Sequence, residues 1–109
     1  MPQNSFREIL LEAVDESLSY LGDSPKQAIL FHLECSFKIK KERIPENITE
    51  FAKALEKIFG PGASYLEKLI VKRLHEKIGL ESKEAERWNF LEYVDDVRNF
   101  SLAKERVAV

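Results

Sequence analysis

A helix break followed at once by an apolar helix, residues 59–79, constrains this chain more than any other stretch. Gly60 can close a helix because glycine adopts left-handed backbone angles without steric cost. Pro61 cannot continue that helix because it has no N–H to donate. Ser64 and Glu67 then have the spacing of a capping box, which starts a new helix. The sequence therefore predicts a tight turn between two helices.

The helix that starts at Ser64 is predicted to lie at the centre of the fold. Its apolar side chains recur at helical spacing: Leu66, Leu69, Ile70, Val71, Leu74 and Ile78. They cover about half of the helix circumference, whereas a helix on the surface needs only a narrower stripe. We therefore expect neighbours on more than one side and a stop at Gly79. The polar arc that remains, Tyr65, Lys68, Lys72 and His75, is a candidate contact face.

The rest of the chain predicts four more helices. Apolar residues repeat at helical spacing in four segments: 5–21, 24–37, 47–59 and 82–102. A connection without a strand, held by Ile39 and Ile44, is expected between the second and third. The fold class is thus all-α, a compact single domain over 1–109 with about five helices. Residues 1–4 and 104–109 are expected to be loose tails. Short links favour antiparallel neighbours.

The second helix has the clearest start signal. Ser24 is the expected cap, Pro25 occupies the first helical position, and Gln27 completes a capping box. This helix is apolar nearly all round, so we expect it to be well buried. Cys35, near its end, is then expected to be a small buried residue.

Composition and charge set limits on compartment and partners. The chain has 109 residues, 44% hydrophobic and 33% charged, with net charge −2. Its single cysteine excludes an internal disulfide, and it has neither a signal peptide nor an apolar run near the roughly 20 residues of a membrane span. We expect a cytoplasmic protein with no membrane association. Residues 1–24 carry a charge of −4, residues 25–43 carry +3 and residues 61–79 carry +2. These segments are either neighbours in the fold or face different partners.

Two basic patches leave a nucleic-acid role open. They span residues 38–43 and 68–77, and their lysines could meet phosphates while Tyr65 stacks on a base. Glutamates interrupt both runs, namely Glu42, Glu67 and Glu76. A solvated or internally paired face is the favoured interpretation of both patches.

No cofactor, metal, small-molecule or catalytic site is predicted. His32 and Cys35 have a spacing that could supply two metal ligands, but His75 is the only other histidine and zinc needs three or four ligands. Asp95 and Asp96 lie near Tyr93, yet adjacent residues on a helix point apart. Pro61 removes an N–H from any phosphate-binding loop at residues 60–62. We therefore predict that the protein is not an enzyme.

The last predicted helix carries four large aromatic residues. They are Trp88, Phe90, Tyr93 and Phe100. Core packing explains them if all are buried, and an interface with a second copy or another protein explains them if some are exposed.

Three segments of the chain resemble a known family. They are SPKQAILFHLE, RIPENITEFAKALEKIFGPGASYLEKLIVKRLHEKIGL and NFLEYVDDVR. Together they resemble the archaeal Nitrosopumilus output domain family from about Ile9 to Phe100, most specifically at IPEN, LEKIFGPGA and LEKLIVK. The resemblance implies an archaeal signalling or regulatory module, and it carries over no catalytic residue.

The functional expectation is a non-catalytic protein-interaction or regulatory module whose partner is another protein or a second copy of this chain. The predicted interaction surface consists of Tyr65, Lys68, Lys72, His75, Phe90 and Phe100. The alternative is a nucleic-acid-associated regulator that uses the basic patches at 38–43 and 68–77.

Overall fold

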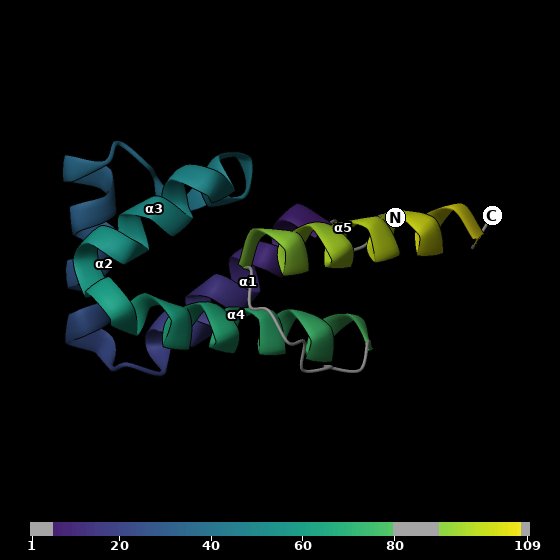
Figure 1. The fold of residues 1–109 in the computed structure, drawn as a ribbon, viewed down its shortest axis with the longest axis horizontal. Coiled ribbons are helices and arrows are strands. Elements are labelled where there is room, and N and C mark those ends of the chain that lie inside the picture. The colour runs from purple at the N-terminus through teal and green to yellow at the C-terminus, as the bar shows by residue number, and fades with distance from the viewer. Residues whose placement is uncertain (1–5, 80–89, 108–109) are drawn as a thin grey trace.

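The predicted all-α class is confirmed. The structure is a computed structural model that describes residues 6–79 and 90–107, with side chains up to residue 100, and these ranges contain no strand. Five α-helices and two 3₁₀ helices follow in order: α1 (Phe6–Ser19), α2 (Asp23–Ser36), η1 (Lys41–Asn47), α3 (Ile48–Phe59), η2 (Gly60–Gly62), α4 (Ala63–Ile78) and α5 (Phe90–Val107) (Figure 1).

Helix α4 is the centre of the packing, as its apolar circumference predicts. It contacts α1, α3 and α5. Its buried side chains spread over several sides of the helix: Ala63, Leu66, Glu67, Ile70, Val71, Leu74 and His75. One continuous hydrophobic core forms around it, with Leu10 and Leu18 of α1, Phe51 of α3 and Val97 of α5 all fully buried.

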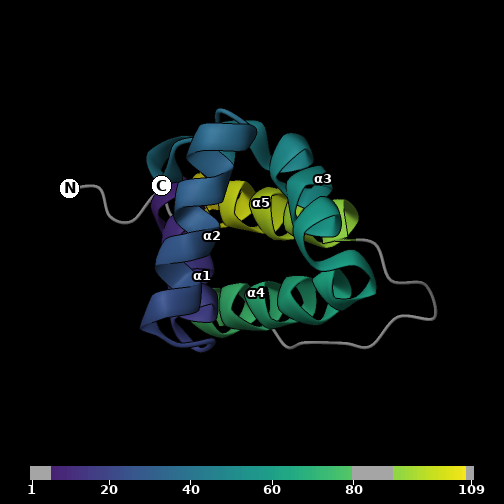
Figure 2. The same cartoon turned by 90° about the vertical axis from the view of Figure 1, so that its left-hand side faces the viewer.

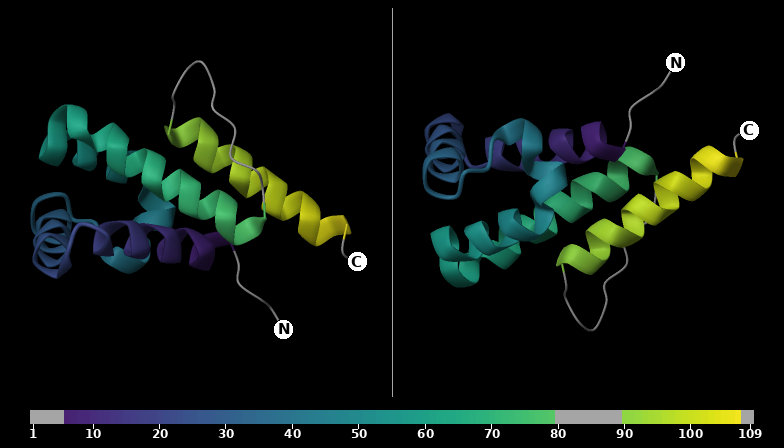
Figure 3. Two further views of the ribbon diagram at one scale, coloured as in Figure 1. Left: turned by 90° about the horizontal axis from the view of Figure 1, so that it is seen from below. Right: turned by 90° about the horizontal axis from the view of Figure 1, so that it is seen from above.

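The relative direction of the helices differs from the expectation in one place. Helix α1 lies beside α4 and runs antiparallel to it, but α5 runs beside α4 in the same direction (Figures 1 and 3). The prediction of antiparallel neighbours is therefore wrong for this pair. Ten residues of sequence separate Gly79 from Phe90, more than a tight turn between antiparallel helices needs, so the link does not force α5 to run antiparallel to α4.

Glycines end α3 and α4, as predicted. Gly60 follows Phe59 with φ 58° and ψ −132°, and Gly79 follows Ile78 with φ 74° and ψ 23°. Both conformations suit glycine because an L side chain meets steric strain there.

The predicted capping boxes at Ser24 and Ser64 are wrong. Helix α2 begins at Asp23 with Gly22 as its N-cap, and α4 begins at Ala63, so both serines lie inside the first turn. Neither helix start has a side-chain cap hydrogen bond. The 3₁₀ turn η2 leads directly into α4, and the Ser64 hydroxyl donates instead to the carbonyl oxygen of Pro61 at 3.4 Å.

The connection between α2 and α3 agrees with the prediction. Ile39 and Ile44 are both buried, and most of the segment forms the 3₁₀ helix η1. The N–H of Ile39 donates to the carbonyl oxygen of Leu33 at 3.0 Å, which ties the segment back to α2. Helix α3 then begins directly after Asn47, where its start was expected.

Helix α2 is much less buried than predicted. Only Ile29 and Leu33 are buried within it, whereas Cys35 is exposed and Phe31 has 71% of its surface exposed. The physical reason is its position, since α2 lies at one end of the molecule and packs mainly on α1 (Figure 2). One neighbour can cover only one side of a helix.

Loose tails were expected at both ends of the chain. Helix α5 continues to Val107, so residues 104–107 are helical and the expected loose tail is wrong over that range. The expected helix start at Ser82, Trp88 and the tail at residues 1–4 lie outside the described residues.

The α3–α4 turn supplies a matched pair of glycines. Gly60→Ala should lower the free energy of unfolding by about 1–3 kcal/mol, because its backbone angles strain an L residue. Gly62 has φ −70° and ψ −12°, and an added Cβ would lie 3.8 Å from the Cβ of Phe59. Gly62→Ala should therefore raise the stability by about 0.4–1 kcal/mol. Urea unfolding of both variants measures the difference, and equal effects would contradict the described turn.

Candidate functional site: a tyrosine–lysine groove on α4

The outer side of α4 carries an open groove with a volume of about 460 Å³. Its lining residues are Tyr20, Tyr65, Lys68, Leu69, Lys72, Arg73 and Glu76. All but Tyr20 belong to α4, and Tyr20 comes from the turn after α1. We call this set the tyrosine–lysine groove.

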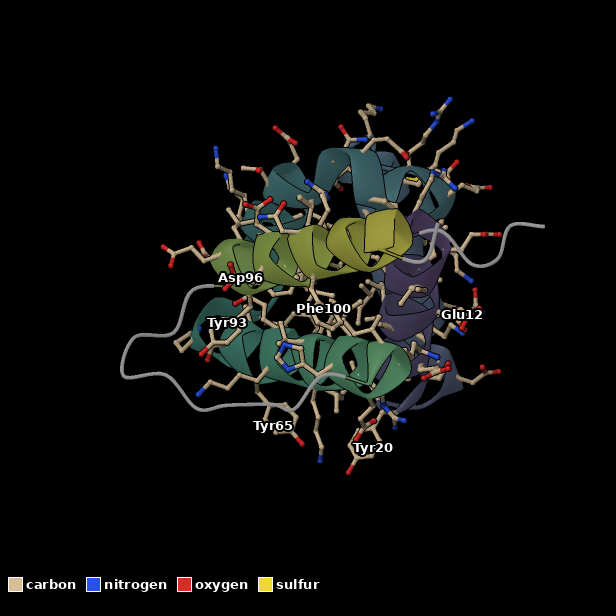
Figure 4. All side chains as sticks on the ribbon, turned by 90° about the vertical axis from the view of Figure 1, so that its right-hand side faces the viewer. Glu12, Tyr20, Tyr65, Tyr93, Asp96 and Phe100 are labelled. Carbon is tan, nitrogen blue, oxygen red and sulfur yellow. The ribbon has the colours of Figure 1, made fainter. Side chains whose placement is uncertain are left out.

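Two exposed tyrosines define the groove. Tyr20 has 64% and Tyr65 has 62% of its surface exposed. Both side chains lie on the same side of α4, Tyr65 from α4 itself and Tyr20 from the turn after α1, and both point away from the core (Figure 4). Lys68 and Lys72 are also exposed and follow Tyr65 at spacings of three and seven, which places them on the same helix face. Aromatic rings and cations thus share one accessible surface.

Ion pairs between α1 and α4 flank the groove. The Nζ of Lys77 lies 2.8 Å from Oε2 of Glu16 and 3.2 Å from Oε1 of Glu12, and Nη1 of Arg73 lies 3.8 Å from Oε1 of Glu16. The hydrogen bond to Glu16 raises the pKa of Lys77 above its usual value. These contacts accompany the antiparallel packing that brings Tyr20 beside α4.

A second set of ion pairs joins α1 to the other basic segment. Oδ1 of Asp15 lies 2.8 Å from Nζ of Lys26 and 2.6 Å from Nζ of Lys41. Hydrogen bonds from these two lysines lower the pKa of Asp15. Arg7 and Glu46 form a further pair at 2.5 Å. The acidic first helix is therefore a neighbour of both basic segments and pairs with each, which decides between the alternatives that the charge pattern left open.

The predicted interaction surface is only partly a surface. Tyr65, Lys68 and Lys72 lie in the groove, as described above. His75 and Phe90 retain only 5% and 4% of their surface exposed, so their assignment to a contact surface is wrong. Both side chains are buried where α4 and α5 pack together, because α5 covers the side of α4 that carries His75 and Phe90 is the first residue of α5. Phe100 is partly exposed, on the side of α5 that faces α4 (Figure 4).

His75 is a buried histidine in an apolar setting. Its ring lies 6.3 Å from the ring of Tyr93, and its Nδ1 has no hydrogen-bond partner among the described residues. Burial lowers the pKa of His75, and the charge of Asp96 opposes this shift more weakly. The imidazole is therefore held neutral near pH 7, which suits a packing role.

Tyr20 and Arg73 belong to the groove but were absent from the predicted surface. Arg73 belongs to the predicted basic patch 68–77, and its position beside Lys72 is a usable sequence signal. Tyr20 carried no local signal, because it reaches the groove only through the packing of α1 on α4.

The described part of the chain contains no group of three or more histidine, cysteine, aspartate and glutamate side chains placed to hold a metal ion. None of its helices combines the length and the apolar character needed to cross a bilayer.

No family model, curated protein or solved structure matches the chain. The resemblance to the archaeal output domain family therefore stays a prediction.

His75 makes stability depend on pH in a defined direction. Its pKa is lowered in the folded state, so the unfolded state binds the proton more readily as the pH falls through about 6.5. Wild-type protein should lose stability between pH 7.5 and pH 5.5. His75→Phe should lose less, whereas His32→Gln, at an exposed position, should behave as wild type. Urea unfolding at both pH values measures this. An equal loss in wild type and His75→Phe would contradict a buried neutral imidazole.

Proposed function

We propose that this protein is a non-catalytic protein-interaction module whose tyrosine–lysine groove binds an acidic segment of a partner protein. The observation that carries the proposal is the pair of exposed tyrosines, Tyr20 and Tyr65, beside the cations of α4. Tyrosine and arginine are enriched in protein interfaces because they combine apolar area with hydrogen bonding at low entropic cost.

The charges of the groove favour an acidic partner. Lys68 and Lys72 outnumber Glu76, the one acidic residue in the lining, and Arg73 is paired with Glu16 of α1. Lys72 is exposed and makes no ion pair within the described residues, so its ammonium group can reach a carboxylate of a partner. Charge complementarity of this kind directs encounter and selects between partners more than it adds affinity.

A nucleic-acid-associated role is the second candidate. The observation in its favour is the exposed face of Tyr65 next to Lys68 and Lys72, an arrangement on which a base could stack. Against it, Lys41, Arg73 and Lys77 are engaged by carboxylates of α1. Those carboxylates lie between the two basic patches and would repel phosphates. Few basic residues of the two patches remain outside these pairs. Phosphate binding rests on many simultaneous contacts, so this number counts against a nucleic-acid role.

We further propose a regulatory role in the cytoplasm. The resemblance to archaeal signalling output domains supports the regulatory part. The single cysteine supports a reducing compartment. An output module of this kind would act by presenting its groove to a downstream protein.

Charge reversal tests the groove directly. A peptide-display library would be panned against the folded protein, and the enriched peptides titrated by NMR. We expect enrichment of acidic peptides whose binding shifts the amide signals of α4 around Tyr65 and Lys72. Lys72→Glu should weaken binding of these peptides by about tenfold or more, as loss of a close charge pair does.

Lys53 provides the matched control, because it is an exposed lysine on α3 outside the groove. Lys53→Glu changes the net charge equally and should alter the affinity less than about twofold. Equal losses in both variants would show a nonspecific charge effect. Binding of single-stranded oligonucleotides with a steep salt dependence, and no acidic peptide, would replace the proposal with the second candidate.

A further inference from the structure

One face of α2 carries a narrow seam of small and apolar side chains that the described part of this chain leaves uncovered. Ser24, Ala28, Phe31 and Cys35 are all exposed, and their spacing of four, three and four residues places them along one side of the helix. Phe31 is the most exposed large apolar residue described, at 71%. The opposite side of α2, with Ile29 and Leu33, packs into the core. Helix α2 is thus apolar on two sides and covered on one.

The seam is complementary to itself when a second copy runs antiparallel. If Ala28 of one copy faces Phe31 of the other, the large ring meets a small side chain. The same register places Ser24 opposite Cys35, again two small groups. The four facing pairs of residues are 24 with 35, 28 with 31, 31 with 28 and 35 with 24. The residue numbers of each pair average 29.5, so one twofold axis between residues 29 and 30 relates the two copies. Such a surface is the kind that builds an isologous dimer.

The charges at the two ends of α2 favour the same antiparallel orientation. Asp23 lies in the first turn, while Lys38 and Lys40 follow the last turn. All three are exposed, and none makes an ion pair within the described residues. Antiparallel pairing brings the acidic start of one copy to the basic end of the other.

We propose that α2 is the interface of a homodimer, with a second copy of this chain packed antiparallel along the seam Ser24, Ala28, Phe31 and Cys35. This interface is separate from the tyrosine–lysine groove and does not depend on the proposed function. A 14-residue helix buries less area than the roughly 1,200 Å² of a stable complex, so the dimer exchanges with monomer. Dimerisation would present two grooves in one assembly, which increases avidity for a partner with repeated acidic segments.

Cysteine cross-linking reports the register of the dimer. Ser24→Cys places a second thiol opposite the native Cys35 of the other copy. Positions 24 and 35 of the same helix lie about 16 Å apart, too far for a disulfide within one chain. We expect Ser24→Cys to become a covalent dimer on mild oxidation. Wild type should stay largely uncrosslinked, because its two Cys35 residues are also about 16 Å apart across the pair.

Lys53→Cys is the control for random collision, since it keeps Cys35 and adds an exposed thiol on α3. Cross-linking of Ser24→Cys well above that of Lys53→Cys supports the antiparallel register. Equal cross-linking of the two variants overturns it. Efficient cross-linking of wild type through Cys35 would overturn it as well, because the proposed register keeps the two Cys35 residues about 16 Å apart.

Sedimentation equilibrium between about 10 µM and 1 mM tests the seam itself. The average mass of wild type should rise towards two chains, whereas Phe31→Glu should raise the dissociation constant by about tenfold or more. Ala28→Glu should act in the same way, and circular dichroism confirms that both variants remain folded. Tyr65→Glu removes an equally exposed aromatic ring from the groove and should dimerise as wild type. A monomeric wild type at 1 mM, or dimers unaffected by both α2 variants, would overturn the proposal.

Discussion

The burial of α4 is the constraint on which the rest of the structure depends. Its apolar side chains face several directions, so no single neighbour can remove them from water, and α1, α3 and α5 all pack on it. The hydrophobic effect is proportional to the apolar area removed from water, so this helix organises the core. One arc remains accessible, and the groove residues Tyr65, Lys68 and Lys72 occupy it.

The ion pairs set the charge pattern of the surface more than they set the stability. The side chains in the pairs of α1 with α4 or η1 keep 20–53% of their surface exposed, and pairs with such access to water contribute little free energy. Their effect is to neutralise the basic residues that flank the groove. Lys41 and Lys77 are occupied by Asp15, Glu12 and Glu16, so the basic stripes of the sequence shrink to a small cationic face. This small cationic face supports the proposal that the groove binds an acidic protein segment and not a nucleic-acid backbone.

Both proposed surfaces contain solvent-exposed aromatic residues. Tyr20 and Tyr65 lie at the groove, and Phe31 lies on α2. Each ring exposes more than half of its surface, whereas the hydrophobic core residues are at most 9% exposed. An exposed aromatic ring beside complementary polar or small groups is a common mark of a binding surface. The groove offers cations to a different molecule, whereas the α2 seam offers a surface that matches itself.

The sequence by itself determined the all-α class, the central position of α4, the glycine stops at Gly60 and Gly79, and the anchoring of the α2–α3 connection by Ile39 and Ile44. These features follow from hydrophobic period and backbone chemistry, which act over a few residues. Only the tertiary structure decided which sides of the helices are covered. Apolar content made α2 look buried, yet its end position leaves Phe31 and Cys35 exposed. His75 looked like part of a polar arc, yet α5 covers it. The direction of α5 and the position of Tyr20 beside α4 depend on contacts between segments distant in the sequence. Local sequence patterns do not predict such contacts.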